Sequence, residues 1–119
     1  MTSSEPRLLD YLSHIKQAID NINNDTNTLD FIEFEQNPTI QRSVIFSFIV
    51  IGEASTKISQ KYPSFIEDNS HIAWQAMKGM RNHLAHGYFS INLKVLWRTI
   101  IIELPTLETQ IHTLIESHD

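Results

Sequence analysis

One long segment, residues 38–61, constrains the fold more than any other part of this 119-residue chain. Asn37 precedes Pro38, and a capping side chain followed by a first-turn proline is typical of a helix start. Tyr62 precedes Pro63, and a residue before proline disfavours helical backbone angles. We therefore expect the longest helix of the chain to run from Pro38 to about Lys61.

Within this helix, the stretch from Val44 to Ile51 is apolar on all sides apart from Ser47. A helix with one side in water shows an apolar stripe instead, so this stretch is predicted to be covered on more than one side. The helix could be central in a monomeric bundle, or a second copy of the chain could cover it in a homodimer. The stretch is far shorter than the ~20 residues that span a bilayer.

Helical patterns precede the long helix. The first is predicted to start at Pro6, with Ser4 as its cap, and to end in the asparagine-rich stretch 21–27. A short helix from Leu29 to Glu35, with Thr28 as cap, should follow. The apolar face of the first helix recurs at steps of four and three residues, through Leu8, Leu12, Ile15, Ile19 and Ile22.

After the long helix, a loop is predicted from Ser64 to Ser70, followed by a helix that stops at Gly87. A further helix should be kinked or broken by Pro105, and the last helix should start at Thr106. The predicted inner side of the helix before Gly87 consists of Ile72, Ala73, Ala76, Met77, Met80 and Leu84. No strand alternation persists, so we expect a single all-α domain over residues 1–119, a bundle of about five or six helices.

Composition limits the class of protein. The chain is 41% hydrophobic with only 3 Gly and 4 Pro, which favours a globular helical domain. It has no Cys and no basic segment followed by an apolar one at its N-terminus, so we expect a cytoplasmic protein without disulfides or a signal peptide. The formal charge of -5 is wrong for a surface that attracts nucleic acid everywhere. Activity on RNA would need a local basic pocket.

The stretch from Arg81 to Tyr88, RNHLAHGY, gathers the groups with the most chemistry. An Arg grips phosphate with a bidentate fork, and a His gives or takes a proton near neutral pH. On a regular helix Arg81 and His86 would lie about 140° apart. Either the chain unwinds near Ala85-His86, which Gly87 permits, or the two groups meet across a two-fold axis.

This stretch resembles the R-x4-H-x-Y signature of HEPN-domain ribonucleases, with Asn82 as the polar residue that often follows the Arg. Within that superfamily the chain is similar to the HepT-like toxins. The likeness covers roughly residues 7–115. It also includes Ile51-Gly52-Glu53-Ala54, Met80-Arg81-Asn82, and Leu96-Trp97 followed by Leu104-Pro105.

The resemblance implies a homodimeric toxin that cleaves RNA, with transfer RNA as substrate class, at a site shared by two chains. Metal-free cleavage needs a base, an acid and a cation against the phosphate. We assign proton transfer to His86, phosphate binding to Arg81 and a supporting role to Asn82. By the same resemblance, an MntA-like nucleotidyltransferase antitoxin would transfer AMP to Tyr88. No cofactor and no membrane partner are expected.

Other interpretations stay open for these residues. Arg81 could be a surface residue paired with a carboxylate such as Glu53, although Glu53 and Lys57 have the spacing of a pair along one helix. His86 could be a helix-end residue, Asn82 a cap and Tyr88 a packing anchor. His83 and His86 have no carboxylate within four residues, so no metal site is expected. The alternative function is a non-catalytic HEPN accessory subunit of a minimal nucleotidyltransferase, which the acidic charge favours.

Overall fold

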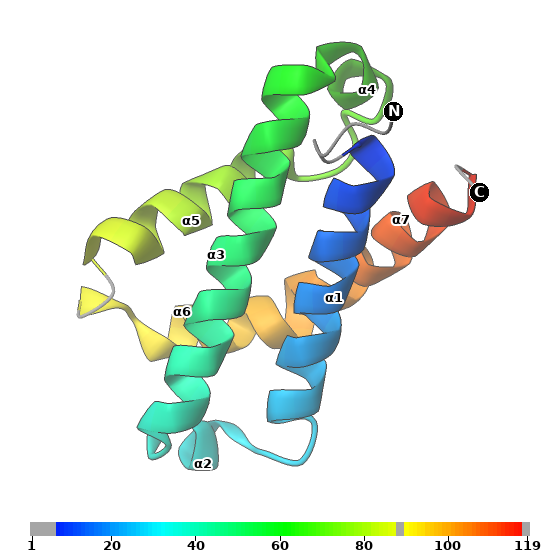
Figure 1. The fold of residues 1–119 in the computed structure, drawn as a ribbon. Helices are drawn as coiled ribbons and strands as arrows, with labels where there is room; N and C mark the ends of the chain where they lie inside the picture. Colours follow the sequence, from blue (N-terminus) through cyan, green and yellow to red (C-terminus); the bar gives the residue numbers. More distant parts are fainter. Residues whose placement is uncertain (1–6, 88–89, 118–119) are drawn as a thin grey trace, which may run out of the picture.

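The computed structural model describes residues 7–87 and 90–117, and the regular structure in this part of the chain is helical throughout (Figure 1). Because α6, η2 and α7 follow one another without a break, the elements form six helical rods, which confirms the predicted all-α bundle. The elements are α1 (Leu8–Thr26), α2 (Phe31–Glu35), α3 (Pro38–Lys61), α4 (Pro63–Asp68), α5 (Trp74–Gly87), α6 (Leu93–Arg98), the π-helical η2 (Thr99–Glu103) and α7 (Leu104–Ser117).

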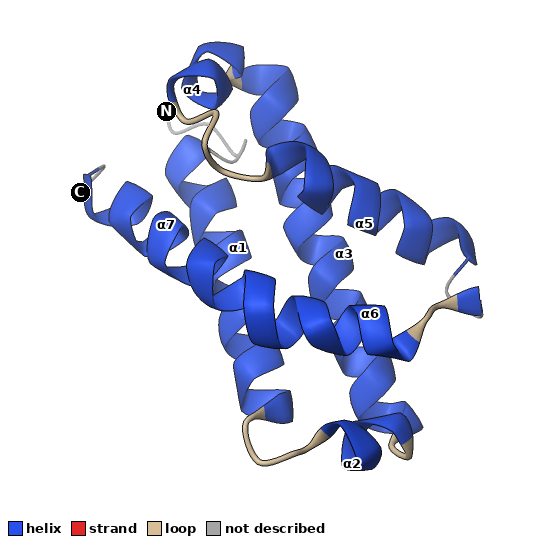
Figure 2. Ribbon diagram, turned by 180° about the vertical axis from the view of Figure 1, so that it is seen from behind, coloured by secondary structure: helices blue, strands red, loops and turns tan. Residues whose placement is uncertain are grey.

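Helix α3 is the central element of the bundle. It packs against α1 on one side and against α5 on the other, while the continuous rod α6–η2–α7 crosses the α1–α3 pair and lies in front of it in Figure 2. Helix α7 packs on α1, and α2 contacts both α3 and α6. Each long helix contributes fully buried apolar side chains to one core, including Leu12, Ile19, Ile51, Ile58, Leu84, Leu96 and Ile111.

The bounds of α3 confirm the prediction from Pro38 to Lys61. Its N-terminus is capped by Asn37, whose side chain accepts a hydrogen bond from the Ile40 amide at 3.1 Å. The apolar stretch in its middle is covered on most sides, but Phe46 is 67% exposed, and Ile49 and Val50 are half-buried. We call Phe46, Ile49 and Val50 the outer stripe of α3. None of the helices described is both long and apolar enough to cross a bilayer.

Helix α1 ends at Thr26, inside the asparagine-rich stretch, which confirms the predicted end. Ile22 and Thr26 are buried there, and the Thr26 hydroxyl donates to the Ile22 carbonyl at 2.7 Å. Two predicted starts are wrong. Helix α1 begins at Leu8, with Arg7 at its N-cap, and not at Pro6; Ser4 and Pro6 themselves lie outside the described residues. Helix α2 starts at Phe31 rather than Leu29, because Asp30 and not Thr28 is the cap.

The cap of α2 is a reciprocal pair of hydrogen bonds. The Asp30 carboxylate accepts from the Glu33 amide at 2.8 Å, and the Asp30 amide donates to the Glu33 carboxylate at 3.1 Å. This capping box satisfies two backbone donors that a Thr28 cap would leave without an intrahelical partner.

Two predictions about proline need correction: the loop predicted after Pro63 is wrong, and of the kink or break predicted at Pro105 the break is excluded. The predicted loop from Ser64 is largely the short helix α4, since Pro63 both ends α3 and occupies the first turn of α4. Pro105 does not break the rod. The turn before it widens to a π-helix, in which the Leu104 amide donates to the Thr99 carbonyl five residues earlier. The last helix therefore begins at Leu104 and not at Thr106, and the widened turn accommodates a residue that has no N–H to donate.

Candidate active site

Helix α5 carries the predicted site residues and is attached to the bundle by one side. Trp74, Met77 and Leu84 are buried on that side, and the Trp74 indole N–H donates to the Asn69 carbonyl at 3.0 Å. The helix ends at Gly87, as predicted, and the Ser90 hydroxyl donates to the Gly87 carbonyl at 2.9 Å. Both ends of α5 are therefore joined by hydrogen bonds to residues outside the helix.

The helix is unbroken from Trp74 to Gly87, so the first of the two alternatives, unwinding near Ala85-His86, is excluded. Five residues on a regular helix separate Arg81 from His86 by about 140° around the axis and by roughly 7.5 Å along it. The two side chains therefore lie on different sides of α5 and cannot contact the same phosphate oxygen from one chain. The second alternative, in which Arg81 and His86 of two chains meet across a two-fold axis, stays a prediction.

Helices α3 and α5 approach most closely where Gly52 faces Arg81. A Cβ atom at Gly52 would lie 2.1 Å from the Arg81 Cβ and 2.7 Å from the Met77 carbonyl oxygen, so only glycine fits. Glycine in a helix interior costs about 0.5–1 kcal/mol relative to alanine. Glycine is nevertheless present here, at the point where the aliphatic part of the Arg81 side chain packs on α3.

The Arg81 guanidinium has one ion-pair partner and one hydrogen-bond acceptor. Its Nη2 lies 3.0 Å from Glu53 Oε2, and its Nη1 donates to Asn82 Oδ1 at 3.1 Å. The Arg81 Nε is buried and has no hydrogen-bond partner. Glu53 thus pairs with Arg81 across the two helices, as one of the open interpretations held, and not with Lys57 along α3.

This ion pair is partly exposed, with 32% of the Arg81 and 47% of the Glu53 side chain accessible. Pairs of this kind contribute about 0–1 kcal/mol to stability because solvent screens them. Packing at Gly52, rather than the ion pair, therefore accounts for the position of the Arg81 side chain against α3.

The other predicted site residues lie toward the end of α5. Asn82 and His86 are exposed, as is His83 between them. Tyr88 lies outside the described residues. Within the described ranges, no three His, Asp or Glu side chains are placed to hold a metal ion.

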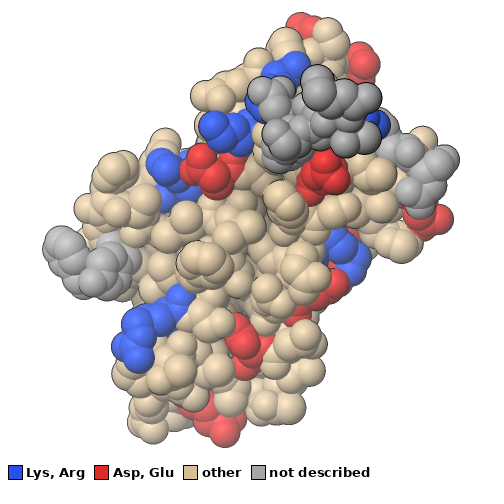
Figure 3. Space-filling model, viewed as in Figure 1, with Lys and Arg blue, Asp and Glu red and all other residues tan. Residues whose placement is uncertain are grey.

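Basic groups do not form a continuous surface on the face shown in Figure 3, where Lys and Arg alternate with Asp and Glu over the described residues. Lys78 is half-buried and lies one helical turn before Arg81 on the same side of α5. A basic site at Arg81 would therefore be local, as the net charge of -5 requires.

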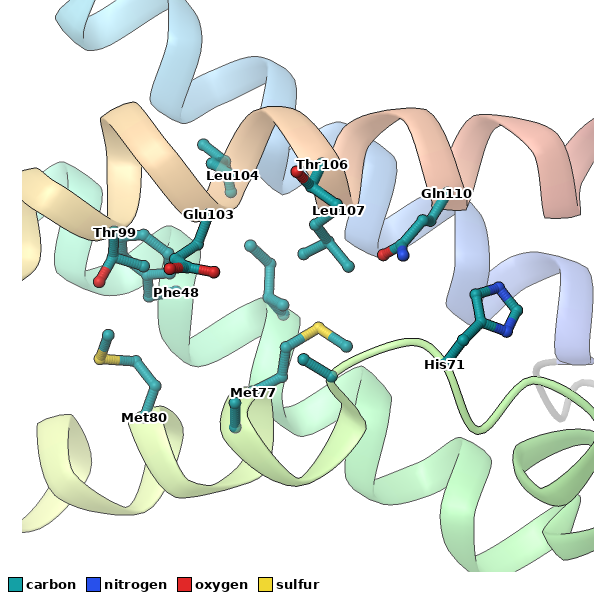
Figure 4. A pocket seen from close by; sticks show the side chains of 13 residues that line it. Phe48, His71, Met77, Met80, Thr99, Glu103, Leu104, Thr106, Leu107 and Gln110 are labelled. Carbon is teal, nitrogen blue, oxygen red and sulfur yellow. The ribbon is translucent and has the colours of Figure 1, made fainter.

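A separate groove of about 380 Å³ lies between α5 and the rod (Figure 4). Ala73 and Ala76, which were predicted to face the core, are exposed and line this groove, whereas Met80 both lines it and packs against the core as predicted. Neither Arg81 nor His86 contributes to it. The remaining lining comes from Phe48, Ile51, His71, Met77, Thr99, Glu103, Leu104, Thr106, Leu107 and Gln110.

Sequence reasoning missed the role of Gly52, which was noted only as part of a family-like stretch. The available signal was an isolated glycine inside an otherwise apolar helical pattern, which indicates close approach of another backbone or side chain. Only the structure identifies Arg81 as the side chain that occupies that space.

A family model and the relatives with similar sequences all carry names of ribonucleases. The family model described as Ribonuclease HepT-like matches residues 10–114. "Probable ribonuclease HepT" from Thermococcus cleftensis is 33% identical over 105 residues, which cover 88% of this chain and 93% of that protein. "Putative RNase TTE0752" from Caldanaerobacter subterraneus subsp. tengcongensis is 32% identical over 106 residues, which cover 89% and 92%. No solved structure matches the chain.

Proposed function

The chain belongs to the HepT-like ribonuclease family, and on that premise we propose that it cuts RNA internally, without a metal, through Arg81 and His86. Family membership makes it a ribonuclease, and both residues fall inside the matched range. The observation that carries the proposal is the unbroken α5. Because one chain holds Arg81 and His86 on different sides of that helix, we propose that a second chain completes the site.

The proposed chemistry uses two copies of each residue. One His86 takes the proton from the ribose 2'-hydroxyl, whose oxygen then attacks the phosphorus. The P–O5' bond breaks, and the second His86 gives a proton to the leaving oxygen, so that a 2',3'-cyclic phosphate and a 5'-hydroxyl result. Arg81 offsets the charge that builds on the phosphate. Acid–base catalysis of this kind contributes typically ~10²–10⁴-fold.

The outer stripe of α3 is the proposed dimer contact. Phe46 is exposed, and Ile49 and Val50 are half-buried, so a single chain leaves part of this apolar stripe in water. Glu53 is seven residues beyond Phe46, two helical turns along the same side of α3. A two-fold contact on the stripe would thus lie next to the Glu53–Arg81 pair and would bring two copies of Arg81 toward one cleft.

We further propose that the protein is the toxin of a toxin–antitoxin pair in the cytoplasm, with transfer RNA as its substrate class. Its antitoxin would be an MntA-like nucleotidyltransferase that adds AMP to Tyr88. Tyr88 follows His86 by two residues, so a modified phenol would bring phosphate charge and an adenine close to the proposed proton-transfer group. That negative charge would repel the substrate phosphate.

The proposal is tested by RNA cleavage with purified variants. Arg81→Ala and His86→Ala should each lower the rate by at least ~10²-fold while the helical circular dichroism stays unchanged. His83→Ala, an exposed histidine on the same helix, is the matched control and should cleave normally. EDTA should have no effect.

Three results would contradict the proposal. Near-normal cleavage by Arg81→Ala would remove Arg81 from the site. Loss of activity in EDTA that zinc restores would point to a His83/His86 metal site. A wild-type protein that binds a nucleotidyltransferase and cleaves no RNA would support the accessory-subunit alternative, which the acidic net charge favours.

A further inference from the structure

We propose that Glu53 is a positioning residue that fixes the plane of the Arg81 guanidinium for end-on binding of the scissile phosphate. Glu53 has this role only if Arg81 contacts that phosphate, so the assignment rests on the proposed function.

The stem of Arg81 is held by packing. Its Cβ and Cγ occupy the space that any side chain at Gly52 would need, and its Nε is buried at the α3–α5 contact. Rotation near the backbone is therefore restricted. What stays adjustable is the orientation of the guanidinium plane at the end of the side chain.

One ion-pair partner and one hydrogen-bond acceptor set that orientation. Glu53 Oε2 forms an ion pair with Nη2 at 3.0 Å, and Asn82 Oδ1 accepts from Nη1 at 3.1 Å. The two partners come from different helices and contact the two ends of the fork. Asn82 is adjacent to Arg81 and moves with it, whereas Glu53 belongs to α3 and supplies the fixed reference.

The donor inventory leaves room for substrate. A guanidinium has five N–H groups, one on Nε and two on each Nη. The burial of Nε closes the side-on approach through Nε and Nη2. Asn82 accepts from one N–H of Nη1, and Glu53 pairs with Nη2 by charge. N–H groups on both Nη atoms therefore remain for the substrate, and such a pair can bind a phosphate in a bidentate manner.

A purely structural role for Glu53 has a close match elsewhere in the molecule. Lys16 and Asp20 form an ion pair at 2.8 Å within α1, with side chains 31% and 41% exposed. The Arg81–Glu53 pair has nearly the same exposure, 32% and 47%. If Glu53 only stabilised the fold, loss of its charge should have the same effect as loss of the Asp20 charge.

The test compares Glu53→Gln with Glu53→Met on one RNA substrate, with Asp20→Asn as control. Both Glu53 variants lose the charge and keep the side-chain length, but only glutamine keeps an oxygen at the end of the side chain that can accept from Nη2. Glu53→Gln should keep kcat within about threefold of wild type. Glu53→Met should lose about 10- to 100-fold in kcat with a smaller change in KM, because misplaced groups cost rate. Asp20→Asn should leave kcat unchanged.

Two further variants complete the experiment. In an Arg81→Lys background Glu53→Gln and Glu53→Met should become equal, since lysine has no planar fork to orient. If Glu53→Met does not fold, Glu53→Asp replaces it; its shorter carboxylate should reach Nη2 poorly and give a lower kcat than Glu53→Gln.

Equal kcat for Glu53→Gln and Glu53→Met would overturn the positioning role. So would faster cleavage by Glu53→Met than by wild type, which would mean that Glu53 competes with the phosphate. Normal cleavage by Arg81→Ala would instead overturn the proposed function, so the two failures are distinguishable.

Discussion

The two sides of α5 are built in opposite ways. On the side of α3 the helices are so close that a single added methyl group at Gly52 would lie 2.1 Å from the Arg81 Cβ. On the side of the rod they are separated by a groove of about 380 Å³. Arg81 lies on the close side, whereas the half-buried Met80 next to it in sequence lines the groove.

This difference teaches where the molecule can tolerate change. A close contact fixes a side chain but allows no increase in volume, since packed interiors respond to a single methylene. An open groove fixes little and can take up additional atoms. The proposed phosphate-binding residue is placed on the side of α5 that cannot move without moving α3.

The largest effect on assembly and RNA cleavage is expected from a change in the outer stripe of α3, the helix against which Arg81 packs. Phe46→Glu should keep the fold, because Phe46 is 67% exposed, but should abolish the dimer and with it RNA cleavage. Light scattering should change from about twice 13.8 kDa to the single-chain mass. Ile32→Glu, at a position 63% exposed on α2, is the control and should stay dimeric. A wild-type chain that is strictly monomeric at micromolar concentration would contradict the dimer.

The second effect concerns the close contact itself. Gly52→Ala should lower the free energy of unfolding by about 1–3 kcal/mol, because the new Cβ forces α3 and α5 apart. RNA cleavage should fall with it, since Arg81 is displaced. The matched control is Gly79→Ala on α5, the helix that Gly52 of α3 faces. A Cβ at Gly79 meets nothing within 4 Å. That variant should gain about 0.5–1 kcal/mol from helix propensity, measured by urea unfolding. Equal effects of the two variants would contradict the comparison.

A smaller effect on rate is expected just after α5. Tyr88→Phe should reduce cleavage only about two- to twelve-fold, the value of one neutral hydrogen bond. The variant should nevertheless escape neutralisation by a nucleotidyltransferase antitoxin, because the accepting oxygen is gone. Intact-mass spectrometry after incubation with antitoxin and ATP checks this. Added AMP masses that persist in Tyr88→Phe would exclude Tyr88 as the acceptor.

The smallest effect is expected on the groove side. Ala76→Leu adds three carbon atoms to an exposed groove position, and alanine and leucine have similar helix propensities. The free energy of unfolding should therefore change by less than about 0.5 kcal/mol, and cleavage should be normal. A loss as large as that of Gly52→Ala would show that the groove is closed in solution.

The sequence predicted the central part of the fold well because its signals are local. Asn37-Pro38 and Tyr62-Pro63 define both ends of α3, and each acts through its own backbone geometry. Predictions failed where one residue has two compatible roles. Pro63 was taken only as a stop although it also fits a first turn. Pro105 was expected to kink or break the helix, and a widened turn accommodates it without a break.

The candidate site divides in the same way. Arg81, His86 and the angle between them on a helix could be predicted from residue type and spacing. The contact of Arg81 with Gly52 and the choice of Glu53 as its partner could not, because they depend on how two helices cross. Whether the chain unwinds after Ala85 was equally open, and the tertiary structure keeps α5 regular to Gly87.

The widened turn at Thr99–Glu103 should affect how fast its backbone amides exchange their hydrogens. Its i to i+5 hydrogen bonds close wider rings than those of an α-helix, and Pro105 directly after it supplies no amide. We expect the amides of this turn to exchange with deuterated solvent well before those of α1 and α3, as weakly protected segments open locally without global unfolding. Thr99 and Glu103 also line the groove, so each such opening would change the groove wall while the contact between α3 and α5 stays closed.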